Sequence, residues 1–179
     1  MKKDLVIFDG SNFYHGAKQL SLRTHLIDFD YEKLVKLIEG GDNCSIEYCV
    51  GEIRQNKRDI KSQTLYANQQ SLFYHLEQQG VVVKKGYMLR HLQYHEKGVD
   101  VQIAIDIVRG ALKNEYSRCF LVSSDTDIIP AILDAQKAGK KIIYVGFDKS
   151  ISRALKANCS ETVLITKQMI LECAKKRKK

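Results

Sequence analysis

The chain has 179 residues, of which 44% are hydrophobic and 28% charged, and its formal net charge is +8. This composition is that of a globular domain with a core of its own. No apolar run approaches the about 20 residues of a membrane-spanning helix, which excludes that class of membrane protein. The last five residues, 175–179, are all basic. We therefore expect one domain over residues 1–170 and a basic tail over residues 171–179.

Strand-like and helix-like runs alternate along the chain. The predicted strands cover residues 4–9, 45–53, 81–89, 118–124 and 140–147. One short helix is predicted to follow Ser11. The other predicted helices cover residues 30–40, 63–80, 99–113, 127–139 and 167–174. This order predicts an α/β fold whose mainly parallel sheet of about five strands has helices on both faces. Such sheets bind ligands outside the carboxyl ends of their strands, where the strand order reverses.

Acids stand where this rule places a ligand. Asp9 ends the first predicted strand, Asp125 follows the fourth, and Asp100 begins the helix that leads into the fourth. Two of these junctions share one edge of a parallel sheet. The helix that carries Asp100 runs antiparallel to its strand, so its start lies over the same edge. We expect the three carboxylates to converge there.

Capping explains one acid of the sequence SSDTDIIPAIL. Pro130 fits the first turn of a helix, where its missing N–H costs nothing, and this makes Asp127 the expected N-cap. Capping does not explain Asp125, which we place at the end of a buried strand with no Lys or Arg between Cys119 and Ala135. A buried carboxylate needs a partner, and a divalent cation is one. Mg²⁺ is commonly held by carboxylates together with water and substrate phosphates.

Other residues are candidates for holding RNA or for positioning the acids. Basic side chains lie on a loop after the second strand and around the third strand, where Tyr87 and Tyr94 are interleaved with them. These basic residues are Lys57, Arg58, Lys85, Arg90 and Lys97. Basic residues position a phosphate backbone, and aromatic rings stack on unpaired bases. Asn12, Asp106 and Ser123 are the candidates for positioning the acids.

The segments DLVIFDGSN, KGVDVQIAID and CFLVSSDTDIIPAILDAQKAGKKIIYVG together resemble the NYN domain in its LabA-like branch, a relative of the PIN nucleases. The resemblance runs from Asp4 to about Ile165. It implies a PIN-like three-layer α/β/α sandwich and a metal-dependent ribonuclease site. Carried over to this sequence, the catalytic acids are Asp9, Asp100, Asp125 and Asp127, and the resemblance implies that the first three hold Mg²⁺ or Mn²⁺.

The sequence departs from the family pattern at two places. Ser124 stands where the family has glycine. A serine there would be strained if the position needs a positive φ, and it would crowd the site if a phosphate has to approach closely. Ile128 stands where the family has an aromatic residue. PIN relatives often carry a further acid in an early helix; Glu32 and Glu39 are in range, and nothing in the sequence selects either.

Three functions are consistent with these residues. The first is a metal-dependent endoribonuclease that acts on single-stranded or looped RNA. The second is a catalytically weak or inactive PIN-like module that binds RNA or protein, which Ser124 favours. The third is a phosphatase, although the DxD motif that aspartyl-phosphate chemistry needs is missing after the first strand. We expect no membrane partner, and the sequence leaves a homodimer open. The five cysteines form no CxxC pair, which indicates reduced thiols in a cytoplasmic protein.

Overall fold

A seven-stranded sheet forms the centre of the computed structural model, which describes residues 3–22, 24–39, 41, 43–90 and 94–174, with the backbone alone at 89, 90, 94 and 95. The strand order is β4-β3-β2-β1-β5-β6-β7, and only β3 and β4 pair antiparallel. The strands are β1 (Asp4–Asp9), β2 (Cys44–Glu52), β3 (Val82–Arg90), β4 (Tyr94–Lys97), β5 (Arg118–Val122), β6 (Lys141–Phe147) and β7 (Glu161–Ile165).

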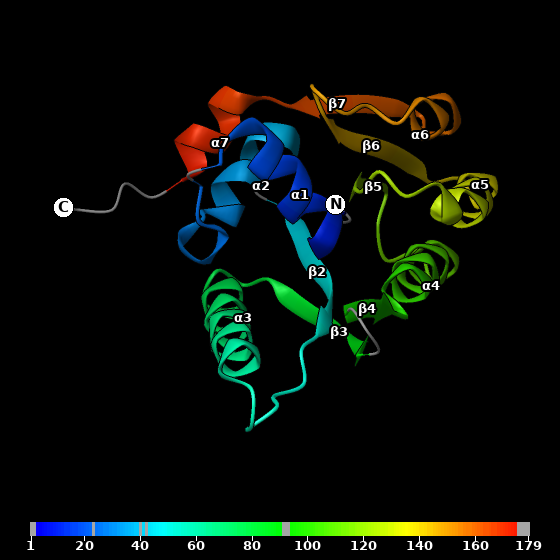
Figure 1. Cartoon of the computed structure of the whole chain (residues 1–179). Coiled ribbons are helices and arrows are strands. Elements are labelled where there is room, and N and C mark those ends of the chain that lie inside the picture. Colours follow the sequence, from blue (N-terminus) through cyan, green and yellow to red (C-terminus); the bar gives the residue numbers. More distant parts are fainter. Residues whose placement is uncertain (1–2, 23, 40, 42, 91–93, 175–179) are drawn as a thin grey trace.

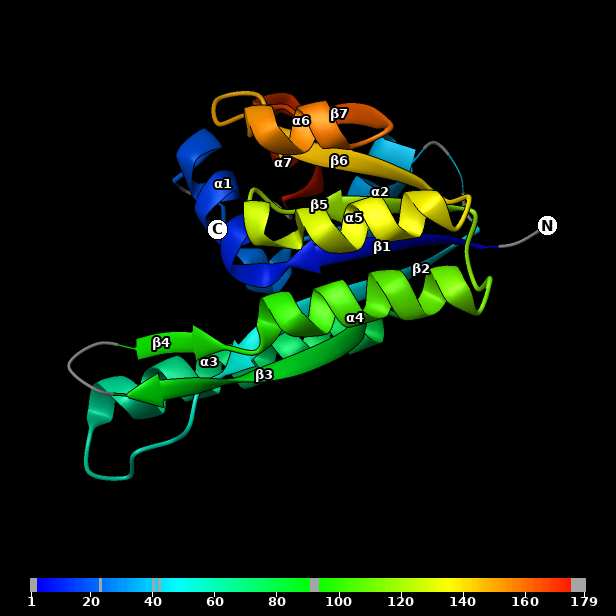
Figure 2. The same cartoon turned by 90° about the vertical axis from the view of Figure 1, so that its right-hand side faces the viewer.

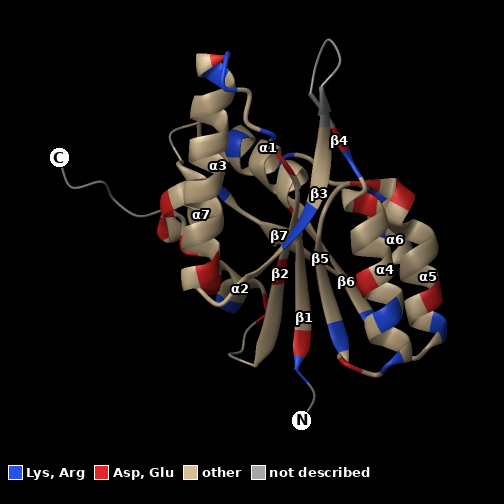
Figure 3. Cartoon of the chain, turned by 90° about the horizontal axis from the view of Figure 1, so that it is seen from below, with Lys and Arg blue, Asp and Glu red and all other residues tan. Residues whose placement is uncertain are grey.

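Helices cover both faces of the sheet, as Figures 1 and 3 show. One face carries α1 (Gly10–Leu20), η1 (Leu26–Asp28), α2 (Tyr31–Glu39), α3 (Ile60–Gln78) and α7 (Lys167–Cys173). The other face carries α4 (Val99–Leu112), η2 (Thr126–Ile128), α5 (Ile129–Lys137) and α6 (Arg153–Asn158). The predicted three-layer α/β/α architecture is therefore confirmed. No helix in the described part of the chain is long and apolar enough to cross a membrane.

The central strand β1 is buried over its whole length. Val6 and Phe8 pack into the core beneath α1, α2 and α3, whereas Leu5 and Ile7 pack into the core beneath α4 and α5. A strand that is buried on both faces needs a continuous apolar run rather than an alternating one, which is the pattern of this segment. The two cores hold Asp9, the last residue of β1, at a fixed position.

The expected number of about five strands was too low, because β4 and β7 were not predicted. β4 has the polar sequence YHEK and β7 has five residues, and neither carries the apolar run that identifies a buried strand. At the other end of the chain, α7 extends to Cys173, which is buried. Residues 171–173 of the expected tail thus belong to a packed helix, and residues 175–179 lie outside the described part.

The strand order reverses at β1, which pairs with β2 on one side and with β5 on the other. The chain builds β2, β3 and β4 outward from β1 and then returns through α4 to β5. Figure 2 shows the carboxyl end of β1 and the start of α4 at the same side of the molecule. This reversal places the topological switch point of the sheet at the carboxyl ends of β1 and β5.

Candidate active site

Asp9 lies at the switch point and is 1% exposed. It caps α1, because its Oδ1 accepts a hydrogen bond from the backbone N–H of Asn12 (3.0 Å). Its Oδ2 accepts from Asn12 Nδ2 (2.5 Å) and from Ser123 Oγ (2.9 Å). A Cβ at Gly10 would lie 2.6 Å from the ring of Tyr48, so α1 can begin this close to β2 only with glycine. The Asp9 carboxylate is therefore held from three directions.

The two candidate positioning residues Asn12 and Ser123 join Asp9 to the loop after β5. Ser123 Oγ accepts a hydrogen bond from the backbone N–H of Asp125 (3.1 Å), and Ser124 Oγ is hydrogen-bonded to Asn12 Oδ1. Outside glycine, Asn114 is the one described residue with a positive φ. Ser124 is therefore not strained by its backbone, and this position does not use the positive φ that glycine would allow.

The prediction that Asp127 rather than Asp125 is the N-cap was wrong. Asp125 is the N-cap of η2, since its Oδ1 accepts from the backbone N–H of Asp127 (2.9 Å). The turn η2 lies between β5 and α5, so the cap falls one turn earlier than Pro130 suggested. Ile128 precedes α5 without a side-chain cap, and Pro130 is in the first turn as expected. Asp125 is half-buried three residues beyond β5, and Asp127 is exposed.

Asp100 is the second residue of α4 and is exposed in its first turn. Burial raises its pKa, and the negative charges of Asp125, Asp9, Glu96 and Asp127 raise the pKa further. Burial also raises the pKa of Asp9, against the hydrogen bonds from Asn12 and Ser123 that lower it. Asp100 is therefore close enough to Asp9, Glu96, Asp125 and Asp127 for their charges to act on it, and we call these five residues the switch-point acids.

Glu96 is the site residue that the sequence analysis missed. It lies on β4, where its Oε2 accepts from Ser11 Oγ (2.6 Å) and its Oε1 accepts from the backbone N–H of Gly51. A Cβ at Gly51 would lie 2.9 Å from Glu96 Cγ and 2.7 Å from Met88 Sδ. Glycine at this position therefore makes room for the carboxylate. The available signal was the spacing in HEKGVD, which puts an acid four residues before Asp100.

Neither acid considered in the early helix lies at this site. Glu39 Oε1 is 3.1 Å from the guanidinium of Arg118, at the amino end of β5 and far from the carboxyl ends of the strands. Glu32 is exposed on α2 and lines a different cavity, together with Lys36 and Gln79. The fifth acid of the cluster therefore comes from the antiparallel strand β4 rather than from an early helix.

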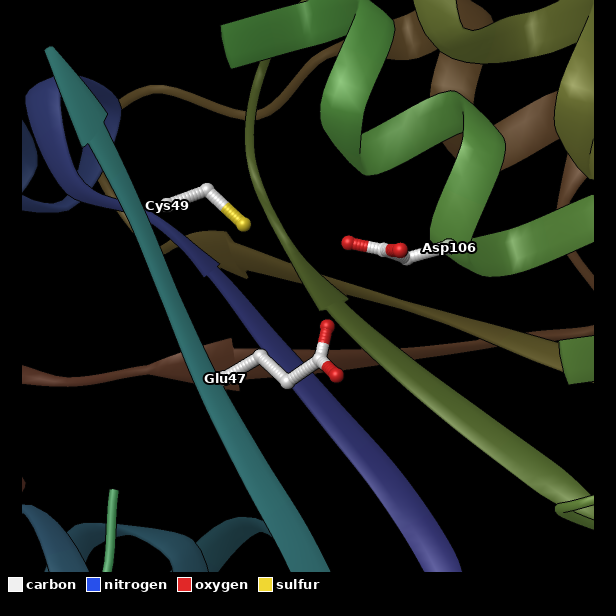
Figure 4. Close-up of side chains that lie close together, drawn as sticks. All are labelled: Glu47, Cys49 and Asp106. Atoms are coloured by element: carbon white, nitrogen blue, oxygen red, sulfur yellow. The ribbon is translucent and has the colours of Figure 1, made fainter. Parts of the chain in front are cut away.

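Asp106 belongs to a second cluster, with Glu47 and Cys49 between β2 and α4 (Figure 4). One ligand atom from each lies within 4.8 Å of the others. Lys84 Nζ is 3.6 Å from Glu47 Oε1 and 3.9 Å from Asp106 Oδ2, so a cation is already present. Burial raises the pKa of Glu47, and the charge of Lys84 lowers it. In the described structure, Asp106 pairs within this cluster and on its own helix rather than with the switch-point acids.

The candidate RNA-binding cations occupy different positions. Lys97 is exposed on β4, beside Glu96. Lys57 and Arg58 are exposed on the loop before α3. Lys85 forms an ion pair with Glu52, with 2.8 Å between Nζ and Oε1. The side chain of Arg90 lies outside the described part. Of these five, Lys97 is nearest to the acids along the chain.

The NYN domain family matches residues 5–166 of this sequence, which is most of the chain. The chain belongs to the NYN domain family. NYN domains are part of the PIN-like superfamily of nuclease folds, and the switch-point acids lie within the matched range. The fold and the family assignment from the sequence are therefore in agreement.

Two further proteins are similar to this NYN domain. A crystal structure of a protein of unknown function from Vibrio parahaemolyticus shares its fold, with a TM-score of 0.65 and 23% identity over 92% of this chain and 93% of that one. An uncharacterised protein of Methanocaldococcus jannaschii is 31% identical over 81 residues, which are 45% of this chain. The match spans only 34% of the length of that relative.

The switch-point acids fit a divalent metal ion by the chemistry of their donors. Every charged group of the cluster is a carboxylate, which suits a hard cation such as Mg²⁺ or Mn²⁺. Among the described residues, no Lys or Arg forms an ion pair with Asp9, Asp100 or Asp125. After burial, the repulsion by neighbouring carboxylates raises the pKa of Asp100, and a bound cation would relieve this repulsion.

Proposed function

We propose that this NYN domain is a Mg²⁺- or Mn²⁺-dependent endoribonuclease of the LabA-like branch, acting in the cytoplasm on single-stranded or looped RNA. The observation that supports the proposal is the effect of the charges of Asp125 and Asp9 on Asp100 at the switch point, with no basic side chain paired to these three acids among the described residues. A structural ion-pair network would include a basic side chain, as the cluster of Glu47 and Asp106 includes Lys84.

The role of each acid follows from how it is held. Asp9, Asp100 and Asp125 would hold the metal ion, which when bound supplies a Lewis acid that neutralises the phosphate and activates water. Asp125 uses Oδ1 for its cap, so Oδ2 is the oxygen that faces a ligand without breaking that hydrogen bond. Asp127 and Glu96 add negative charge at the border of the site.

Other side chains position these acids and the substrate. Asn12 and Ser123 fix both oxygens of Asp9, so the carboxylate does not have to be ordered again when a ligand binds. Lys97 follows Glu96 directly and is exposed, which suits a contact to the phosphate backbone of RNA. Because a cluster of carboxylates suits a metal ion that activates water, hydrolysis by water fits this site better than a covalent intermediate.

The test is a cleavage assay on end-labelled single-stranded and hairpin RNA with Mn²⁺, Mg²⁺ or EDTA. The parent protein is compared with Asp125→Asn and with the control Asp134→Asn, whose exposed carboxylate on α5 pairs with Lys137 instead. We expect metal-dependent cleavage by the parent and the control, and a loss of about 100-fold or more in Asp125→Asn. If the parent cleaves none of the RNAs, the alternative function is favoured: a catalytically inactive module that binds RNA or protein.

A further inference from the structure

A groove of about 520 Å³ lies between α1 and α3, over the carboxyl halves of β2 and β3. Its walls are mainly apolar and come from Ile27, Val50, Ile53, Leu65, Leu72 and Met88. A volume of this size is that of a small-ligand site. The mechanism proposed above uses neither these side chains nor this volume.

The inner end of the groove is the border of the acid cluster. Ser11 and Glu96 line the groove, and Ser11 Oγ donates a hydrogen bond to Glu96 Oε2 (2.6 Å). Gly10 and Ser11, which line the groove, directly follow Asp9 in the chain, so the groove begins beside the expected position of the scissile phosphate. A single ligand could therefore occupy the groove and the acid cluster at the same time.

The outer rim joins an exposed aromatic ring to a cation. Tyr14 is 47% exposed, and Lys18 Nζ lies 5.9 Å from the centre of its ring. Lys18 Nζ donates hydrogen bonds to the backbone oxygens of Leu22 (3.1 Å) and Thr24 (2.8 Å), which hold it in place without neutralising its charge. A ring for stacking beside a fixed positive charge suits a nucleotide, which has a flat base and an anionic phosphate.

The floor of the groove is formed before any ligand binds. Gln69 on α3 donates from Nε2 to the backbone oxygen of Gly51 (2.9 Å) and accepts at Oε1 from the backbone N–H of Ile53 (2.7 Å). These two hydrogen bonds tie α3 to the end of β2. A ligand therefore does not have to order the floor, which reduces the cost of binding.

We propose that this groove binds one unpaired nucleobase of the RNA strand whose phosphate lies at the acid cluster. The inference rests on the proposed function and adds to it a binding site for one base of the substrate. A base reaches an apolar groove only when it is unstacked and unpaired, so the groove selects single-stranded or looped RNA over duplex. Its contiguity with Glu96 and the cation at its rim favour a nucleotide over an apolar protein segment.

Binding of a short single-stranded RNA with a fluorescent end label, measured by anisotropy in EDTA, tests this inference without any need for cleavage. Asn68→Trp fills the mouth of the groove from an exposed position on α3. Gln78→Trp adds the same ring at an exposed position of the same helix outside the groove and is the matched control. Tyr14→Ala removes the exposed ring. Circular dichroism and thermal unfolding confirm that each variant is folded.

We expect Asn68→Trp and Tyr14→Ala to bind the RNA about 5- to 100-fold more weakly than the parent, and Gln78→Trp to bind it as the parent does. The same RNA annealed to its complement should bind weakly to all four proteins. Equal affinity of parent, Asn68→Trp and Tyr14→Ala, or no RNA binding at all, would overturn the inference. Equal RNA affinity of these three proteins would indicate that the groove binds an apolar segment of a protein partner instead. Failure of the proposed function would instead appear as normal RNA binding by the parent without metal-dependent cleavage.

Discussion

Ser123 Oγ donates a hydrogen bond of 2.9 Å to Asp9 Oδ2, although the two residues are 114 positions apart in the sequence. The same hydroxyl accepts from the backbone N–H of Asp125. One buried serine therefore connects the ends of the two strands that flank the switch point, and it fixes the relative position of two acids proposed to share a metal ion.

Removal of this hydroxyl should weaken metal binding. We expect Ser123→Ala to lower Mn²⁺ affinity about 10- to 100-fold while the protein stays folded, because Asn12 still holds Asp9. Isothermal titration calorimetry measures the affinity. Unchanged Mn²⁺ affinity in Ser123→Ala would show that the serine does not position the ligands.

Stability without metal should depend on pH through Asp9 and Asp100. Both carboxylates have a pKa raised above the ordinary value of 3.8, so the folded state binds their protons more tightly than the unfolded state does. Their contribution to stability is thus greatest at low pH and is lost as pH rises through the raised values. In EDTA, we expect Asp100→Asn to melt at a higher temperature than the parent, with a difference that grows from pH 4 toward neutral pH.

Differential scanning fluorimetry over this pH range gives the melting temperatures. Addition of Mn²⁺ should reverse the order, because the parent gains stability from metal binding and Asp100→Asn gains much less. A melting temperature of Asp100→Asn below that of the parent in EDTA at neutral pH would contradict the electrostatic account of the site.

Gly51 should not accept a side chain. In Gly51→Ala the new methyl group would lie 2.7 Å from Met88 Sδ and 2.9 Å from Glu96 Cγ, so the side chains of Met88 and Glu96 must move. We expect a loss of about 1–3 kcal/mol in the free energy of unfolding, measured by urea denaturation. A variant as stable as the parent would show that Glu96 is not held against β2.

Lys84 should stabilise the second cluster without taking part in cleavage. Lys84→Met leaves Glu47 and Asp106 without the lysine that lies between them, and we expect a loss of about 2 kcal/mol at neutral pH. The loss should shrink in acid, where Glu47, whose pKa is raised by burial, is protonated. Lys85→Met is the matched control, because Lys85 forms its ion pair with Glu52, whose side chain is 39% exposed. Urea denaturation of both variants at two pH values decides the prediction, and an equal loss in both would contradict it.

Lys97→Ala should weaken RNA binding with little effect on turnover. A phosphate contact that is the same in the ground state and the transition state raises KM and leaves kcat unchanged. The slope of log affinity against log salt should fall by about 0.7 for a single strand. Lys156→Ala, at an exposed position of α6, is the control. A lower kcat with unchanged KM would place Lys97 in the chemistry instead.

The sequence predicts those parts of the site that depend on the alternation of strands and helices. Asp9, Asp100 and Asp125 each stand at a junction that apolar runs define, and this topology alone brings their backbones to one edge. Glu96 could not be found in this way, because the short polar strand β4 is held by its pairing with β3 rather than by burial.

The cap at Asp125 and the position of Asp106 depend on local geometry that apolar periodicity does not encode. A single turn, η2, separates β5 from α5 and moves the cap from Asp127 to Asp125. Asp106 is on the buried face of α4, and only the packing of that face on β2 shows that its partners are Lys84 and Glu47. Both features follow from tertiary packing.

The most direct test of the central claim is a Mn²⁺ titration followed by electron paramagnetic resonance, with the parent, Asp125→Asn and the control Asp134→Asn at neutral pH. Free Mn²⁺ gives the signal, so its loss reports binding without any RNA. The account predicts stoichiometric uptake by the parent and the control, and an affinity at least about 10-fold weaker in Asp125→Asn. Equal uptake by parent and Asp125→Asn, or no uptake by the parent, would contradict a metal site at the carboxyl ends of β1 and β5.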